Sequence, residues 1–448
     1  MKASRACFVL ACGLWLGFAS AGRADTYTYT TLAGLAGPSG AGSADGTNYA
    51  ARFNTPYGVA TDGAGNIYVA DTINCTIRKV APSGTNWVVT TLAGLANSHI
   101  WADGTNSAAR FFYPEGVAMD SAGNLYVADS ANYVIRKLAP VGTNWVVTTL
   151  AGLAGTQDST DGTNNHARFY NPYGVAVDRA GTLYVTDHDY NTVRKIAPIG
   201  TNWVVTTLAG AVLGASGSAD GTNRNAQFSA PAGLVVDSAT NLYVADGGNC
   251  TIRKLTPVGT NWVVTTLAGS AAGGCSSADG TNAVARFNSP AGIVVDSATN
   301  LYVADSGNYT IRKLAPAGTN WVVSTIGGLA GNLGSADGTN SVARFRSPAG
   351  VAVDSQGILY VADTGNNTVR MGVPSLVTAP TLRFVRSTNK VILSWPLTAS
   401  SYGLETRGTV PSGTSWSPVN TGVVTAGTRY YWTNTIGSVP AFYRLHKQ

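Results

Sequence analysis

Carboxylate side chains are the first residues to consider for chemistry, because hydrolases and lyases usually need them as acids, bases or metal ligands. The chain of 448 residues carries 23 Asp and Glu. Eighteen of them occupy three positions of a unit that occurs six times, typified by Asp-Gly-Thr, Val-Asp and Val-Ala-Asp. Repetition of this kind predicts a structural role, either turn capping or pairing with a repeated arginine. The acids outside the repeat are Asp25, Asp158, Asp189, Glu115 and Glu405.

Arginine recurs with the same period, and a basic ladder of this kind could bind a polyanion. The six members are Arg78, Arg136, Arg194, Arg253, Arg312 and Arg370. Residues 25–374, however, hold 19 Lys and Arg against 22 Asp and Glu. The net charge of +6 therefore comes from the two ends of the chain and does not indicate a nucleic-acid partner. We expect these arginines on solvated strand faces and in ion pairs.

Histidine and cysteine give no recognisable catalytic or metal motif. The four histidines, His99, His166, His188 and His446, do not repeat, and no His-x-Glu-x-x-His, Cys-x-x-Cys or Gly-x-Ser-x-Gly pattern exists. His188 and Asp189 could supply two metal ligands, but a metal site needs three or four converging ligands. We therefore predict surface-loop roles for them, with no catalytic residue, metal or cofactor.

Internal repetition reveals the elements that must position these residues. Leu-Tyr-Val-Ala-Asp recurs at intervals of 58 or 59 residues, with its last residue at Asp71, Asp129, Asp187, Asp246, Asp305 and Asp363. Each unit contains four short apolar, β-branched runs separated by turn residues, which predicts four strands. In the third unit the predicted strands are 174–178, 183–187, 192–197 and 203–208. Four-stranded units that repeat radially form a β-propeller, which also protects the sheet edges.

The two ends of the repeat region predict how the ring closes. Five units finish with Trp-Val-Val-Thr-Thr-Leu-Ala-Gly or a near copy, whereas the sixth stops at Pro374 without it. The segment Tyr-Thr-Tyr-Thr-Thr-Leu-Ala-Gly, residues 27–34, supplies the missing strand. The predicted fold is therefore all-β: a six-bladed β-propeller over residues 25–374 that is closed by its N-terminal strand. Low charge and only two Glu argue against a helical bundle.

The repeated residues also resemble a known family. Pro-x-Gly-Val-Ala-Val-Asp, Gly-Asn-Leu-Tyr-Val-Ala-Asp and Asn-x-x-Ile-Arg-Lys together resemble the NHL repeat, in six copies over residues 26–374. The resemblance implies a six-bladed propeller. It further implies an interaction platform for protein, RNA or glycan, or, in a related minority of propellers, a metal-dependent lactonase or lyase.

Both ends of the chain indicate an exported protein. Lys2 and Arg5 precede an apolar stretch and small residues, so residues 1–24 are predicted to be a signal peptide. The predicted location is secreted, or periplasmic and cell-envelope, with no membrane span. Residues 375–380 are a predicted linker, and alternating strands with aromatics over residues 381–448 predict a small β-sandwich. This segment resembles immunoglobulin- or fibronectin-like modules of exported bacterial proteins.

An odd number of cysteines is left after removal of the predicted signal peptide. Cys75, Cys250 and Cys275 remain, so at least one is free or pairs with another chain. Cys75 and Cys250 occupy the same position in units one and four, which lie opposite each other in a six-bladed ring. We predict that they are too far apart to form a disulfide. A bond between Cys250 and Cys275 is left open.

The residues that break the symmetry are the candidates for function. Between Pro and Gly at the start of the first strand, the six units read Tyr57, Glu115, Tyr173, Ala232, Ala291 and Ala349. Further departures fall in units one to three: Trp101, Phe112, Tyr113, Tyr133, Tyr170, His188, Asp189 and Tyr190. Exposed aromatics with a polar rim are typical of a binding patch. The alternative is drift among duplicated units, with tyrosine filling channel space.

The predicted function is a secreted, non-catalytic scaffold that binds a glycan or an extracellular protein on the face of blades one to three. The predicted ligand-binding residues are Tyr57, Trp101, Tyr113, Glu115, Tyr133, Tyr170, Tyr173, His188, Asp189 and Tyr190. The alternative is a metal-dependent lactonase or lyase that works in the central channel, with Glu115 as its best-placed acid. The pattern carries no prediction of oligomeric state.

Overall fold

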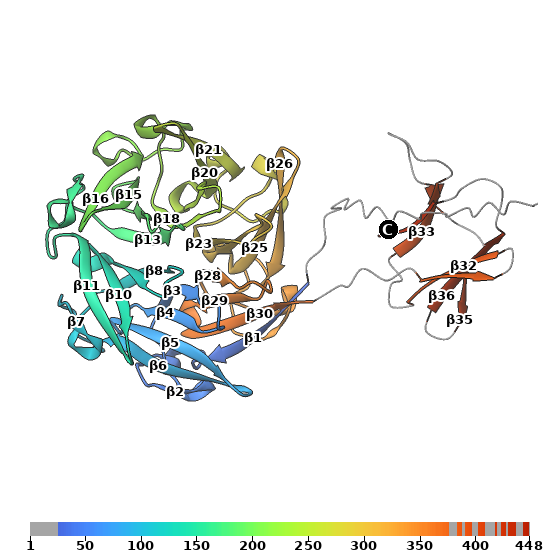
Figure 1. Ribbon diagram of the computed structural model, residues 1–448, viewed down its shortest axis with the longest axis horizontal. Coiled ribbons are helices and arrows are strands. Elements are labelled where there is room, and N and C mark those ends of the chain that lie inside the picture. Colours follow the sequence, from blue (N-terminus) through green and yellow to red (C-terminus); the bar gives the residue numbers. More distant parts are fainter. Residues whose placement is uncertain are drawn as a thin grey trace, which may run out of the picture. The chain divides into compact units, whose positions relative to one another are not determined.

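The computed structural model describes residues 26–375 and, beyond them, seven strands between residues 383 and 447. The chain divides into two compact units, Met1–Pro374 and Ser375–Gln448, which are described separately. In the first unit, six antiparallel sheets are arranged around a central axis (Figure 1). The prediction of a six-bladed all-β propeller is confirmed. The predicted leader, residues 1–24, lies outside the described residues.

The third blade illustrates the common plan. Its strands are β13 (Pro172–Val177), β14 (Leu183–Asp187), β15 (Thr192–Ile199), β16 (Asn202–Ala209) and the short β12 (Gly162–Thr163). The sheet order is β12-β16-β15-β14-β13, with β13 innermost. Every residue of β14 is buried, whereas the outer strand β16 and the end of β15 reach solvent. Each blade thus has a fifth strand beyond the predicted four: the Gly-Thr of the preceding connection, which covers the outer edge.

The other blades follow this plan. Blade one consists of β2 (Gly46–Thr47), β3 (Pro56–Thr61), β4 (Ile67–Asp71), β5 (Thr76–Ser83) and β6 (Asn86–Gly94). Blade two consists of β7 (Gly104–Thr105), β8 (Pro114–Met119), β9 (Leu125–Asp129), β10 (Val134–Val141) and β11 (Asn144–Gly152). Blade four consists of β17 (Gly221–Thr222), β18 (Pro231–Val236), β19 (Leu242–Asp246), β20 (Thr251–Val258) and β21 (Asn261–Gly269). Blade five consists of β22 (Gly280–Thr281), β23 (Pro290–Val295), β24 (Leu301–Asp305), β25 (Thr310–Ala317) and β26 (Asn320–Gly327).

Blade six is assembled from both ends of the propeller. It consists of β27 (Gly338–Thr339), β28 (Pro348–Val353), β29 (Leu359–Asp363), β30 (Thr368–Pro374) and β1 (Tyr27–Ala33). Strand β1 pairs antiparallel with β30 on one side and with β27 on the other. Figure 1 shows β1 in blue beside the orange β30. Closure by the N-terminal strand is therefore confirmed.

Each repeated arginine lies in a buried polar box between the third strand and the connection that crosses it. Nη1 of Arg78 contacts Oδ2 of Asp71 at 2.6 Å, and its Nη2 contacts Oδ1 of Asp45 at 2.7 Å. The guanidinium carbon lies 5.2 Å from the centre of the Phe53 ring. Both ion pairs recur in all six blades, so the predicted pairing is confirmed.

The expectation that these arginines also lie on solvated strand faces is wrong. All six are fully buried, because the long connection folds back over the third strand and encloses the guanidinium. Two carboxylates and backbone carbonyl oxygens such as those of Ala44 and Arg52 accept its hydrogen bonds and offset the loss of hydration. The remaining repeated acid, at the Val-Asp position, caps a turn as predicted: Oδ1 of Asp62 accepts hydrogen bonds from two backbone amides.

One of the three described cysteines is free, as the odd number predicted. Cys250 forms a disulfide with Cys275, whereas Cys75 is a free, buried thiol. The predicted absence of a bond between Cys75 and Cys250 is confirmed, and the open question about Cys275 is answered. The disulfide ties the start of the third strand of blade four to the connection that leads into blade five.

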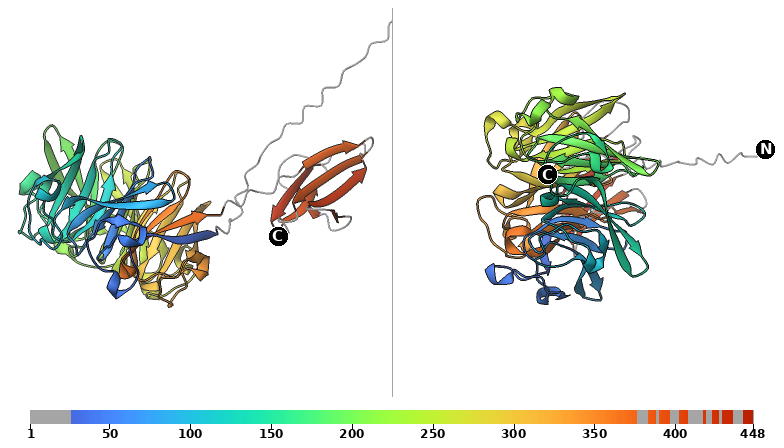
Figure 2. Two further views of the ribbon diagram at one scale, coloured as in Figure 1. Left: turned by 90° about the horizontal axis from the view of Figure 1, so that it is seen from below. Right: turned by 90° about the vertical axis from the view of Figure 1, so that its left-hand side faces the viewer.

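In the second unit the structure describes seven strands. They are β31 (Arg383–Ser387), β32 (Lys390–Pro396), β33 (Tyr402–Arg407), β34 (Ser417–Pro418), β35 (Val423–Ala426), β36 (Arg429–Thr435) and β37 (Phe442–Lys447). They form two antiparallel sheets, of order β31-β32-β36-β35 and β34-β33-β37. Figure 2 shows strands of this unit in orange to red. Most of the predicted linker lies outside the described residues. Among the described segments, no helix is long and apolar enough to cross a membrane.

Candidate binding site at the mouth of the channel

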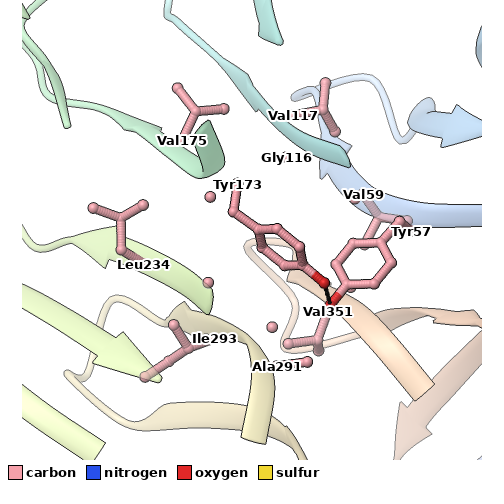
Figure 3. Close-up of a pocket in the computed structure, with 15 residues that line it drawn as sticks. Tyr57, Val59, Gly116, Val117, Tyr173, Val175, Leu234, Ala291, Ile293 and Val351 are labelled. Carbon is pink, nitrogen blue, oxygen red and sulfur yellow. Dashed lines mark hydrogen bonds between the residues drawn. The ribbon is translucent and has the colours of Figure 1, made fainter. Parts of the chain in front are cut away.

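Six glycines bring the innermost strands together around the axis. A Cβ atom on Gly58 would lie 2.1 Å from the carbonyl oxygen of Glu115, and one on Gly350 would lie 2.1 Å from that of Tyr57. The other blades repeat this contact, so each inner strand touches the next one through its backbone. Of the six side chains between Pro and Gly, those of Tyr57, Tyr173 and Ala291 line the channel (Figure 3).

The channel itself is narrow. It is lined by apolar side chains such as Val117, Val175, Leu234 and Ile293, and encloses about 70 Å³. That volume holds only a few water molecules, far below the ~300 Å³ at which pockets for small ligands begin. A molecule as large as a sugar therefore does not fit inside the channel.

Tyr57 and Tyr173 meet across the channel (Figure 3). The hydroxyl of Tyr173 donates a hydrogen bond to that of Tyr57, and the rings lie edge to face with centroids 5.1 Å apart. The matching positions in blades four to six carry the small, buried Ala232, Ala291 and Ala349, which leave room for the two rings.

The prediction that Tyr57 and Tyr173 are exposed aromatics is therefore wrong. Both side chains are half-buried, because their hydroxyls hydrogen-bond to each other and each ring covers part of the other. The alternative stated above, that tyrosine fills channel space, describes the contact between these two residues. Of the two tyrosines, only Tyr173 also contacts a larger cluster of side chains, through His188.

That cluster extends outwards through blade three. The imidazole of His188 stacks on Tyr173, with ring centroids 4.7 Å apart and planes 25° apart. Nδ1 of His188 lies 2.5 Å from Oδ1 of Asp189, whose Oδ2 accepts a hydrogen bond of 3.1 Å from Nδ2 of Asn171. The structure thus brings together an aromatic stack and a half-exposed carboxylate, on residues that depart from the repeat.

Glu115 lies beside this stack, in contact with the short helical turn η4 (Ser130–Asn132). Burial raises the pKa of the Glu115 carboxyl to about 8; a hydrogen bond from Ser130 opposes the rise and the Asp189 charge adds to it. The Ser130 hydroxyl contacts Oε2 of Glu115 at 3.1 Å and the carbonyl oxygen of Pro172 at 2.6 Å. A hydroxyl has one proton, so a protonated Glu115 can donate to Ser130 while Ser130 donates to Pro172.

Tyr170 and Tyr190 form a second aromatic pair nearby, with ring centroids 6.0 Å apart. Tyr190 replaces an asparagine that elsewhere donates to the buried aspartate of the arginine box, as Asn74 does to Asp71. In blade three, Oγ of Ser159 donates to Asp187 at 3.1 Å in its place. The buried carboxylate therefore keeps its hydrogen bonds, although Tyr190 makes none with it and packs near Tyr170 with a tilted ring.

The remaining predicted site residues do not join this cluster. Tyr113 packs against Phe112 and His99, with centroid distances of 4.7 and 5.9 Å. Nε1 of Trp101 donates to Thr149 on the outer strand of blade two, away from the channel. Tyr133 follows η4 at a left-handed φ of 62°, and Tyr309 holds the same position in blade five. Tyr133 is therefore not a departure confined to blades one to three.

Sequence reasoning missed Ser130 and Asn171, although a signal for the first exists. The residue after the Val-Ala-Asp segment is serine or threonine in blades one, two, five and six. In blades one, two and six its hydroxyl donates a hydrogen bond to the proline carbonyl oxygen of the next blade. His188 occupies this position in blade three, and Oγ1 of Thr186 makes an inter-blade contact there instead. Comparison of this position among the units would have marked it as the boundary of the site.

The channel does not offer the donor set that a metal-dependent lactonase or lyase needs. Within the described parts of the chain, no three His, Cys, Asp or Glu side chains converge in a way that could hold a metal ion. The side chains of His188 and Asp189 form a hydrogen bond with each other, and Glu115 is hydrogen-bonded to Ser130.

Fold and site together define a six-bladed β-propeller with a narrow channel and an asymmetric mouth. The model of the NHL repeat matches residues 111–138, 287–314 and 345–370, which belong to blades two, five and six. The chain therefore carries NHL repeats. It is 29% identical over 321 residues to NHL repeat-containing protein 2 of Bos taurus, covering 65% of this chain and 43% of that protein.

One further relative and two solved structures are also similar to this chain. Protein SUPPRESSOR OF QUENCHING 1, chloroplastic, of Arabidopsis thaliana is 30% identical over 300 residues, 62% of this chain and 26% of that protein. The chain thus spans less than half the length of these relatives. A structural genomics protein of unknown function from Bacteroides thetaiotaomicron has a TM-score of 0.60 at 22% identity, over 78% of this chain and 76% of that chain. An auxiliary nutrient binding protein from Bacteroides ovatus has a TM-score of 0.57 at 17% identity, over 78% and 77% of the two chains.

Proposed function

We propose that this chain is a non-catalytic binding protein that takes a glycan, or else an extracellular protein, at the channel mouth on blades one to three. The observation that carries the proposal is the asymmetry of an otherwise repeated scaffold. Blades four to six carry alanine at the position between Pro and Gly, whereas blades one to three carry Tyr57, Glu115 and Tyr173. Ser159, a serine that the repeat also carries at Ser43, Ser218, Ser277 and Ser335, keeps Asp187 hydrogen-bonded where Tyr190 replaces asparagine.

The chemistry of the cluster suits a hydroxyl-rich, ring-shaped ligand. Flat aromatic faces bury the apolar face of a sugar ring at little conformational cost. Tyr170 is 36% exposed and pairs with Tyr190, while half-exposed Asp189 can accept hydrogen bonds from hydroxyl groups. Because the channel holds only about 70 Å³, the ligand would lie across the mouth.

Binding of the full chain to a glycan array tests the proposal. The double variant Tyr170→Ala/Tyr190→Ala should reduce affinity for a captured glycan at least about thirty-fold, since aromatic anchors typically contribute ~2 kcal/mol or more. Asn288→Ala, at the position of Tyr170 in blade five, is the matched control and should leave affinity unchanged. Equal binding by the double variant and the wild type would refute the site. An array without any hit, followed by capture of a protein through the same residues, would select the protein partner.

Export is part of the proposal and rests on the predicted signal peptide alone. The mature chain should begin at Asp25 and be found in the medium or the cell envelope. The second unit, residues 375–448, would then act as a spacer or envelope-attachment module. Terminal sequencing of the protein from fractionated cells tests this, and a chain that retains residues 1–24 in the cytoplasm would contradict it.

A further inference from the structure

Where β1 closes the ring, one core side chain is larger and two neighbouring residues are smaller than their counterparts in the other five blades. Tyr29 of β1 stands where the other outer strands carry a buried valine: Val89, Val147, Val205, Val264 and Val323. Its ring is fully buried and lies edge to face with Phe345, with centroids 5.1 Å apart. A side chain so much larger than valine needs space that the repeat does not normally provide.

Two glycines provide that space. Gly372, opposite Tyr29 on β30, replaces the valine, leucine or isoleucine of the other blades: Val80, Leu138, Ile196, Leu255 and Leu314. Gly327, at the end of β26 in blade five, replaces an alanine of the other outer strands, as at Ala93. A Cβ atom on either glycine would lie 2.5 Å from a carbon atom of the Tyr29 ring. The enlarged and the reduced side chains therefore compensate each other.

We propose that Gly327 and Gly372 form a tyrosine pocket that selects residues 27–33 as the outer strand of blade six. The five other outer strands are near copies of one another, so a wrong strand from this chain or a second copy could pair with β30. A valine in this pocket would leave a cavity, which destabilises the wrong closure. Tyr29 in turn clashes with the filled positions of every other blade, so the correct strand is excluded from the wrong places.

The Tyr29 hydroxyl indicates that shape and not hydrogen bonding makes the selection. It is buried and has no hydrogen-bond partner among the described residues. Tyr27, two residues earlier, keeps the ordinary inter-blade contact of the repeat: it packs edge-on against Tyr302 at 6.3 Å, as Trp145 packs against Tyr68 at 6.0 Å. Along β1, the packing therefore differs from that of the other outer strands at Tyr29 and not at Tyr27.

Thermal unfolding of full-length variants tests the pocket. Tyr29→Val should lower the melting temperature by about 4 to 7 °C because it leaves a cavity. Gly372→Val should lower it by about 2 to 5 °C because the new side chain meets the ring. The triple variant Tyr29→Val/Gly327→Ala/Gly372→Val restores the composition of the other blades and should return to within about 2 °C of the wild type. Losses that simply add in the triple variant would overturn the pocket.

Two further variants separate the alternatives. Tyr29→Phe should keep the wild-type melting temperature within about 2 °C, and a larger loss would mean that the hydroxyl matters. Val147→Tyr places tyrosine at the matched position of blade two, opposite Leu138, and should destabilise where no pocket exists. Selection is read from refolding out of urea by size exclusion. The restored triple variant should yield several-fold more strand-exchanged oligomer than the wild type, and equal monomer yields would overturn selection.

Discussion

Protonation of Glu115 should make the stability of the propeller depend on pH in a direction opposite to that of an ordinary surface carboxylate. Its pKa is about 8 in the folded chain, against about 4.3 for an unperturbed glutamate. The folded state therefore holds a proton that the unfolded state has lost throughout this interval. The stability linked to that proton is complete below about pH 4 and is lost as the pH rises to 8.

The size of the effect follows from the same two values. A difference of nearly four pKa units corresponds to at most about 5 kcal/mol. Because Glu115 is only partly buried, water screens its charge, and we expect about 2 to 3 kcal/mol. Glu115→Gln keeps a hydrogen-bond donor toward Ser130 and cannot ionise. The variant should match the wild type near pH 4 and exceed its free energy of unfolding by about 2 to 3 kcal/mol at pH 9.

Urea unfolding of both proteins between pH 4 and 9 measures this difference, and the titrating groups that the substitution does not affect cancel in the comparison. Asp189→Asn is the internal check: it removes the charge that helps to raise the pKa of Glu115, so the pH dependence should move to lower pH. A difference between wild type and Glu115→Gln that stays constant from pH 4 to 9 would refute the reasoning.

Three further predictions concern the scaffold. Deletion of residues 25–34 exposes β30 and should cause aggregation or loss of cooperative thermal unfolding, whereas an unchanged unfolding curve would rule out the closure. Arg253→Ala leaves Asp246 buried without its partner and should cost about 3 to 5 kcal/mol in urea unfolding; a loss below 1 kcal/mol would show, against expectation, that the pair is dispensable. Gly292→Ala places a Cβ atom 2.2 Å from a carbonyl oxygen of blade six and should lower the melting temperature by several degrees, while Gly63→Ala, which meets nothing within 4 Å, should not.

The sequence by itself determined the architecture of the first unit. Strands and turns are encoded locally, by β-branched runs and Gly or Asp turns, and six copies of one unit leave few ways to bury both faces of each sheet. The closing strand was also predictable, because residues 27–34 resemble the one segment that the last unit lacks. The same comparison among units identified Tyr57, Glu115 and Tyr173 as departures from the repeat.

Only the tertiary structure decided what those residues do. Arg78 looks like a solvated strand residue until the connection from Asp45 folds over it. Likewise, Tyr57 and Tyr173 are 116 residues apart, and nothing local shows that their hydroxyls meet across the channel. Such contacts depend on how blades are placed around the axis, which is set by backbone packing at the inner glycines and not by the pattern within any one unit.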